Sequence, residues 1–211
     1  MIINVPPTRP TPETGLLGDI ESHLYDGHPF KNRDKVTWAH EGTHGINASI
    51  RNKHNGHNNA AYVLNDQAFL LDEPNFTLRD VADAVPQELR GSGYGLYLVS
   101  QQRWWNDHPL YVYDELAAYL NSTRIGMDVN ADYDRVLYSF RKTIEFLGYA
   151  RILIDVYCRT NNVIGDEELD EFPSYVLLFI TSNLRDFPDA RDQYEIVEKY
   201  VYLWHPNTSF I

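Results

Sequence analysis

Apolar residues recur at three- and four-residue spacing along most of this chain, a pattern that predicts mainly helical structure. The first such stripe consists of Val36, Ala39, Thr43, Ile46 and Ile50. Asn32 and Asp34, which both suit a helix N-cap, precede it. We therefore expect an amphipathic helix that begins near residue 35 and ends in the polar cluster at residues 52–59.

One stretch has strand character instead. The apolar segments 60–64 and 67–71 flank Asn65-Asp66, which indicates a β-hairpin with an Asx-type turn. Its edge could accept a peptide strand, or the hairpin could simply cover the core. Residues 77–84 then predict a short capped helix. Three glycines between residues 91 and 95 indicate a flexible connection, with the potential to be a mobile lip.

The rest of the chain returns to helical patterns. We expect a helix at residues 111–122, a long one at 132–159, one that starts at Pro173, and a last one at 189–204. The fold class is therefore mainly α with a small β-hairpin (α+β). Residues 1–30 are interpreted as a Pro-rich arm and loop, 31–126 as a metal-binding core, and 127–211 as a helical bundle packed on that core in a single compact unit.

The metal-binding interpretation rests on His40, Glu41 and His44, a His-Glu-x-x-His motif inside the first predicted helix. Positions i and i+4 lie on one helix face, so His40 and His44 can offer ring nitrogens to one ion. Glu41 would project beside that ion, where a carboxylate can take a proton from metal-bound water. The motif predicts a Zn²⁺ site with its own general base.

This segment resembles the active-site helix of the zincin metallopeptidases. His44 is not followed by Gly-x-x-His, which argues against the metzincin pattern of three histidine ligands. The resemblance therefore points to the gluzincin branch, in which a glutamate from a later helix is the third ligand. It implies hydrolysis of peptide or protein substrates by metal-activated water, with Glu41 as the base. From His40 to about Gly126 there is also a looser similarity to small metal-dependent peptidase-like proteins.

Glu115 is the best candidate for that third ligand. It lies in the helix predicted at residues 111–122, where a half-buried glutamate is costly unless it is paired or binds a metal. The small Ala118, one turn later, permits another helix to approach closely. Asp114 points about a third of a turn away from Glu115 and suits a hydrogen bond to a ligand histidine. The weaker alternatives are Glu73, Glu88 and His108.

Peptide hydrolysis also needs a donor to the developing oxyanion. Tyr111 and Tyr119 lie one turn either side of Glu115, and Tyr94 lies in the glycine-rich connection. The sequence does not choose among these three tyrosines.

Two other classes of function stay open. One is a catalytically silent zincin-like scaffold that acts as a structural or partner-binding protein, with the Pro-rich arm as a docking segment. The other is iron or manganese chemistry on two histidines and a carboxylate. Such sites usually stand on β scaffolds and do not need Glu41, so this third class is the least favoured.

The composition argues against nucleic acid and anionic membranes as partners. The net charge of -12 in 211 residues disfavours nucleic acid and anionic membranes, which need a basic face. The chain has neither a signal-peptide pattern nor 18 consecutive apolar residues, so we expect a soluble protein without obvious targeting. The single cysteine, Cys158, is interpreted as a core residue. His23 and His28 fall in a predicted loop and are given no role.

Overall fold

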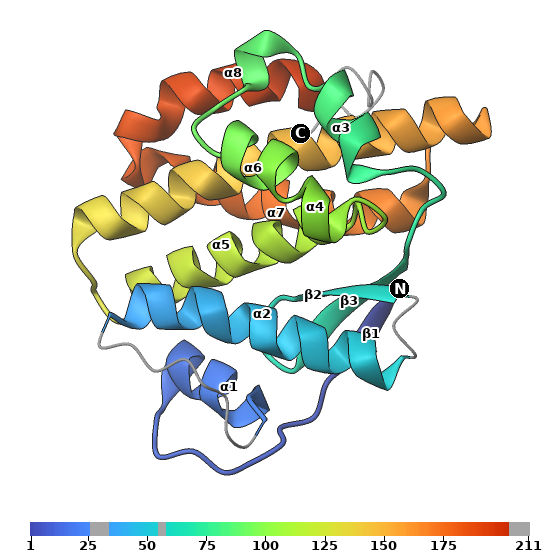
Figure 1. Cartoon of the computed structure of the whole chain (residues 1–211). Helices are drawn as coiled ribbons and strands as arrows, with labels where there is room; N and C mark the ends of the chain where they lie inside the picture. Colours follow the sequence, from blue (N-terminus) through green and yellow to red (C-terminus); the bar gives the residue numbers. More distant parts are fainter. Residues whose placement is uncertain (26–33, 55–57, 203–211) are drawn as a thin grey trace. The chain divides into compact units, whose positions relative to one another are not determined.

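The computed structural model (Figure 1) describes residues 1–25, 34–54 and 58–202, without the side chains of Asn58 and Tyr202. Asn32 and His28 lie outside the described residues. The structure is mainly helical with one small sheet, so the predicted fold class is confirmed. None of the described helices is long and apolar enough to cross a bilayer.

By its internal contacts the chain divides into two units. One contains Met1–Glu73 and Tyr113–Thr143, and the other contains Pro74–Val112 and Ile144–Ile211. These bounds differ from the division expected at residues 30 and 126, because the chain passes between the units within two of its helices.

The first unit combines a three-stranded sheet with helices. Its elements are β1 (Ile2–Asn4), α1 (Gly15–His23), α2 (Lys35–Lys53), β2 (Asn58–Tyr62), β3 (Gln67–Asp72), most of α5 (Tyr111–Asp128) and the start of α6 (Tyr133–Asn161). The strand order is β1-β3-β2, and both pairings are antiparallel. Helix α2 packs along β2 and α1 (Figure 1), and the buried core includes Leu17, Ile20, Ala39, Ile46, Tyr62 and Ile125.

The predicted hairpin is present as β2 and β3. Its connection uses Leu64, Asn65 and Asp66, which all have positive φ angles (69°, 55° and 59°). A third strand, β1, was not predicted. It pairs with β3 so that Ile2 lies opposite Phe69.

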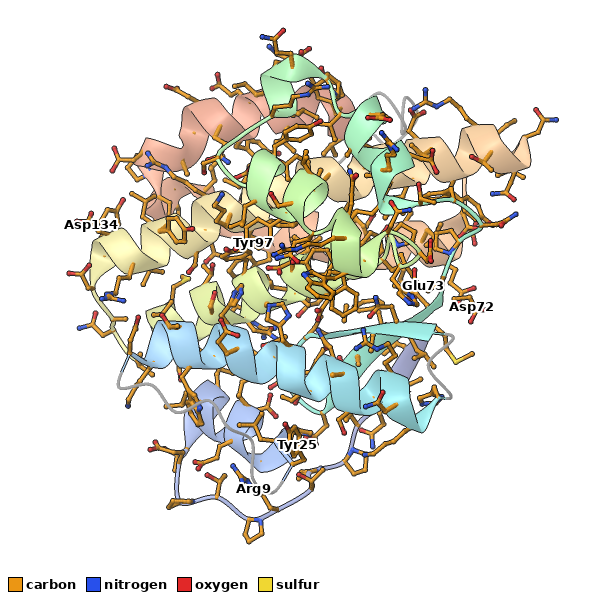
Figure 2. The ribbon with its side chains drawn as sticks, viewed as in Figure 1. Arg9, Tyr25, Asp72, Glu73, Tyr97 and Asp134 are labelled. Carbon is orange, nitrogen blue, oxygen red and sulfur yellow. The ribbon has the colours of Figure 1, made fainter. Side chains whose placement is uncertain are left out.

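The Pro-rich segment after β1 lies along the same unit. The backbone N–H groups of Thr8 and Arg9 both donate to the Ser22 carbonyl, at 2.8 and 3.1 Å. Figure 2 shows Arg9 beside α1, where its Nε donates to the Glu21 carbonyl at 3.0 Å. Residues 1–25 are therefore part of the folded unit, and docking of this segment on a partner stays a prediction.

Helix α2 begins as its sequence predicts. The Asp34 side chain caps it by accepting a hydrogen bond from the Val36 N–H at 3.2 Å, and the predicted apolar stripe is buried. A Cβ at Gly42 would lie 2.8 Å from Cγ2 of Ile20. Glycine at this position therefore allows α1 to pack directly against the middle of α2.

The second unit is helical. It contains α3 (Leu78–Ala84), the 3₁₀ turn η1 (Gln87–Leu89), the π-helical η2 (Tyr94–Ser100), α4 (Gln102–Trp105), the later part of α6, α7 (Glu167–Asn183), the 3₁₀ turns η3 (Leu184–Asp186) and η4 (Pro188–Ala190), and α8 (Arg191–Tyr202). The predicted capping box of α3 is formed by Thr77 and Asp80. The predicted start of α7 at Pro173 is wrong, because α7 begins at Glu167 with Asp166 as its N-cap.

The glycine-rich connection is anchored to α6. The N–H of Gly93 donates to Oε1 of the buried Glu145 at 2.8 Å, and the Tyr149 hydroxyl donates to the same oxygen at 2.6 Å. Tyr97, labelled in Figure 2, meets the Phe146 ring edge-on at 5.2 Å. The expected flexible lip is thus a turn held by a buried carboxylate, followed by the π-helical η2 that begins at Tyr94.

Candidate metal centre

Three side chains from α2 and α5 converge within the first unit. Nε2 of His40 and Nε2 of His44 are 3.1 Å apart, and each lies 3.7 Å from Oε2 of Glu115. Zinc bonds of about 2.0–2.2 Å in a tetrahedral site place neighbouring ligand atoms ~3.3–3.6 Å apart. The triangle formed by these three atoms therefore has the dimensions of a zinc site, and three protein ligands on a tetrahedral zinc would leave its fourth position to a water or a substrate.

Local helix geometry explains the convergence. His40 and His44 are one turn apart on α2, and Glu115 lies near the start of α5 with only 4 % of its surface exposed. A carboxylate this deeply buried needs a cation or hydrogen-bond donors to offset its desolvation.

His44 is held from behind by Asp114. Its Nδ1 lies 2.9 Å from Oδ2 of Asp114, so Nδ1–H donates there and Nε2 faces His40 and Glu115. A carboxylate in this position fixes the ring and raises its basicity in metal sites. The structure thus places Asp114 where the sequence predicts it. Nδ1 of His40, in contrast, is buried without a hydrogen-bond partner among the described residues.

The same charges set the protonation of the metal-free cluster. Burial would lower the pKa of His44, but the carboxylates of Asp114 and Glu115 outweigh it and raise that pKa to about 10. Burial, together with the charge on His44, lowers the pKa of His40 to about 3. Burial works against ionisation of Asp114, yet the charge of His44 and the bonds from His44 and Asn47 hold its pKa below the usual value. The metal-free pair therefore carries one positive charge, on His44, while His40 is neutral.

This distribution predicts how stability depends on pH without metal. The folded state holds the His44 proton more tightly than the unfolded chain does. The stabilisation of the folded state by His44 is therefore complete below about pH 6.5 and is lost as pH rises toward 10. For His40, stability is lost instead as pH falls from about 6.5 toward 3. We expect the two contributions to give a maximum near pH 6.5, with each limb falling by at most about 1.4 kcal/mol per pH unit.

Urea unfolding of chelator-treated protein across pH 4–9 measures these limbs. His44→Gln should flatten the alkaline limb and keep most of the acidic limb, because burial is the larger cause of the lowered pKa of His40. An alkaline limb that is unchanged in this variant would contradict the assignment of the proton to His44. Zinc must displace the same proton, so we also expect about one proton released per zinc bound at pH 7.

Glu41 lies beside the cluster and outside the ligand triangle. Its carboxylate is close enough to help raise the pKa of His44, and its side chain is half-buried. A carboxylate so placed can exchange a proton with a water held at the fourth coordination position.

The three candidate oxyanion donors have different contacts in the structure. The Tyr119 ring packs against the His40 ring with centroids 4.4 Å apart. The Tyr94 hydroxyl donates to the Ala82 carbonyl at 3.1 Å, and Tyr111 stacks on Trp105 with centroids 5.2 Å apart. Tyr119 is therefore the candidate that contacts a residue of the cluster.

None of the other proposed ligands joins the described cluster. Glu73 accepts a hydrogen bond from Nδ2 of Asn59 at 3.1 Å. Glu88 accepts one from the Tyr200 hydroxyl. His108 follows the short helix α4, with its ring centroid 6.3 Å from that of Trp105. Each of these side chains thus has its own local structural partner.

The edge of β2 is covered beside the cluster. The Tyr62 N–H donates to Oδ1 of Asn47 at 2.8 Å, and the Tyr62 carbonyl accepts from Nδ2 of Asn121 at 2.7 Å. The next carbonyl, of Val63, accepts from Nη1 of Arg124 at 2.6 Å. A peptide cannot pair with these backbone groups unless the side chains move, so at this end the hairpin covers the core.

A second group of possible ligand atoms comes from Asp19, His23 and Asp66. His23 is buried at the end of α1, so the interpretation of this histidine as loop surface is wrong. Its Nδ1 and Nε2 each lie 2.7 Å from a backbone carbonyl oxygen, of Asp19 and Val5. Both ring nitrogens thus face oxygen atoms of the protein, and the ring joins the end of β1, α1 and the hairpin turn, where Oδ1 of Asp66 lies 3.1 Å from Nε2.

Comparison with known proteins adds no further assignment. No family model, curated protein or solved structure matches the chain. The chemistry of the site therefore has to be argued from its own residues.

One polar residue of this site was given no role on the basis of the sequence. Asn47 has 2 % of its surface exposed, and its Nδ2 donates to Oδ1 of Asp114 at 2.5 Å. Its position was a usable indication, since residues 40, 44 and 47 fall on one face of a helix.

Proposed function

We propose that this protein is a zinc-dependent metallopeptidase of the zincin type, with His40, His44 and Glu115 as the metal ligands. The observation that carries the proposal is the triangle of three ligand atoms with Asp114 behind His44. Without metal, one ring nitrogen can donate to the other, but that bond leaves the buried carboxylate oxygen of Glu115 3.7 Å from each nitrogen, beyond hydrogen-bond distance. One divalent cation would satisfy all three atoms at once.

Zinc at this position would acidify a coordinated water and polarise a carbonyl oxygen. Glu41, half-buried next to the ligands, is the residue to accept the proton of the attacking water and to return it to the leaving amine. Asp114 keeps His44 in the tautomer that presents Nε2 to the cluster. The substrate class this chemistry fits is a peptide bond in a protein or peptide.

Chelator-stripped and zinc-reloaded protein, incubated with a mixture of unfolded proteins and peptides, provides the test. New peptide termini detected by mass spectrometry should appear with zinc, disappear on chelation and return on reloading. Peptides from bacterial cell walls belong in the same screen. Zinc-loaded protein that leaves every substrate intact would favour the catalytically silent scaffold.

We expect Tyr119→Phe to lower kcat by roughly 10- to 100-fold with little change in KM, because the variant removes the hydroxyl of the tyrosine whose ring packs on His40, and with it the proposed donor to the oxyanion. Steady-state kinetics on the best peptide from the screen measures both constants. Tyr94→Phe is the matched control, since its hydroxyl is bound to the Ala82 carbonyl, and it should retain kcat. Equal kcat values for both variants would remove Tyr119 from this role.

A further inference from the structure

The Asn47 side chain joins strand β2 to the residue behind His44. Its Oδ1 accepts from the Tyr62 N–H at 2.8 Å. A backbone N–H can only donate, which fixes the orientation of the amide and leaves Nδ2 as the group that faces Asp114. The bond from Nδ2 to Oδ1 of Asp114 is 2.5 Å long.

Asp114 is thereby held at both of its oxygens. Oδ1 receives Asn47, and Oδ2 receives Nδ1 of His44 at 2.9 Å. Both Asn47 and Asp114 are buried, with 2 % and 8 % of their surfaces exposed. A buried carboxylate with one oxygen unpaired could rotate or take up a proton, and it would then orient the His44 ring less firmly.

We propose that Asn47 is a positioning residue for the metal centre: it locks Asp114 against His44 and anchors both to the sheet through the Tyr62 amide. This inference rests on the proposed metal centre. The continuous path runs from β2 through Asn47 and Asp114 to the ring nitrogen of His44, and each link is a hydrogen bond of 2.9 Å or less.

Asn121 is the control that distinguishes a positioning role of Asn47 from a purely structural one. Both asparagines are buried, and both bond the backbone of Tyr62, Asn47 at its N–H and Asn121 at its carbonyl. Asn121 donates in addition to the Thr43 hydroxyl and has no described hydrogen bond to Asp114 or His44. Its substitution therefore removes a comparable β2 anchor without touching the support of the ligand.

The experiment compares zinc affinity in the full chain with Asn47→Ala, Asn47→Asp and Asn121→Ala. Asn47→Asp keeps an acceptor for the Tyr62 N–H but puts an oxygen where Nδ2 faces Asp114. Zinc dissociation constants come from competition with a chromophoric chelator. The absorption spectrum of the Co²⁺-substituted protein reports ligand geometry, and circular dichroism confirms folding.

We expect both Asn47 variants to weaken zinc binding by about 10- to 100-fold and to change the Co²⁺ spectrum. Asn121→Ala should stay within about threefold of the wild type even if it unfolds at a lower temperature. Wild-type zinc affinity and spectrum in a folded Asn47→Asp variant would overturn the inference. Wild-type protein that binds zinc but cleaves no peptide would overturn only the proposed function, and wild-type protein that binds no zinc would overturn both.

Discussion

Replacing Glu41 with Gln is expected to reduce peptide hydrolysis by about 10²- to 10⁴-fold while zinc stays bound. Glutamine has the same shape, so it leaves His40, His44 and Glu115 in place, but it cannot accept a proton from the attacking water. The loss should appear in kcat, because Glu41 acts on the reacting atoms and is not itself a ligand. Steady-state kinetics and zinc content, both measured on the same preparation, give the two readouts.

The control for this variant is Glu195→Gln, which changes an exposed glutamate on α8 and should leave kcat unchanged. Substantial activity in Glu41→Gln would show that another group moves the proton. Loss of zinc from Glu41→Gln would instead place Glu41 among the ligands. Either result would contradict the division of roles proposed for the motif.

Removing one ligand should have a comparably large effect on the metal. We expect His44→Ala and Glu115→Ala each to weaken zinc binding by about 10³-fold, which corresponds to about 4 kcal/mol. Structural zinc sites with four protein ligands bind with about 10–16 kcal/mol in total, or about 2.5–4 kcal/mol per ligand, so the expected loss is at the upper end of one ligand's share. Chelator competition gives the dissociation constants.

His54→Ala is the matched control for the histidine variant, because His54 is an exposed residue at the end of the same helix. It should bind zinc like the wild type. Full zinc affinity in Glu115→Ala, combined with its loss in His44→Ala, would mean that a different carboxylate completes the site. Asp114, the carboxylate already bonded to His44, would then be the first to test.

The parts of the site that could be predicted from sequence depend on short-range geometry. A helix fixes where residues four apart point, so His40 and His44 could be placed together as soon as the periodic stripe around them was identified. The helix with Glu115 followed from its own apolar pattern. Adjacent residues on that helix diverge by a known angle, which is why Asp114 could be expected to serve a histidine.

The remaining features depend on contacts between residues distant in the chain. Strand β1 has three residues and is formed only because β3 offers an edge. His23 was expected in a loop, since nothing nearby in the sequence shows that the Val5 carbonyl oxygen lies within hydrogen-bond distance of its Nε2, at 2.7 Å. The covered edge at Tyr62 likewise requires Asn47 and Asn121 from two separate helices. Local propensity does not encode such pairings.

The start of α7 was misplaced for a different reason. Pro173 resembles a first-turn residue, whereas the acidic residues before it looked like a solvated connection. Those residues are the first turn of the helix, where negative side chains interact favourably with the helix dipole. The N-cap Asp166, which accepts from the Leu169 N–H at 2.8 Å, was the better indication.

The central claim is that the triangle of His40, His44 and Glu115 binds one zinc ion. The most direct test is the metal content of the wild-type protein, loaded with zinc, freed of excess metal by gel filtration and analysed by plasma mass spectrometry. We predict about one zinc per chain, and much less in His44→Ala and Glu115→Ala treated in the same way. Folded wild-type protein that retains no zinc after loading would contradict the account.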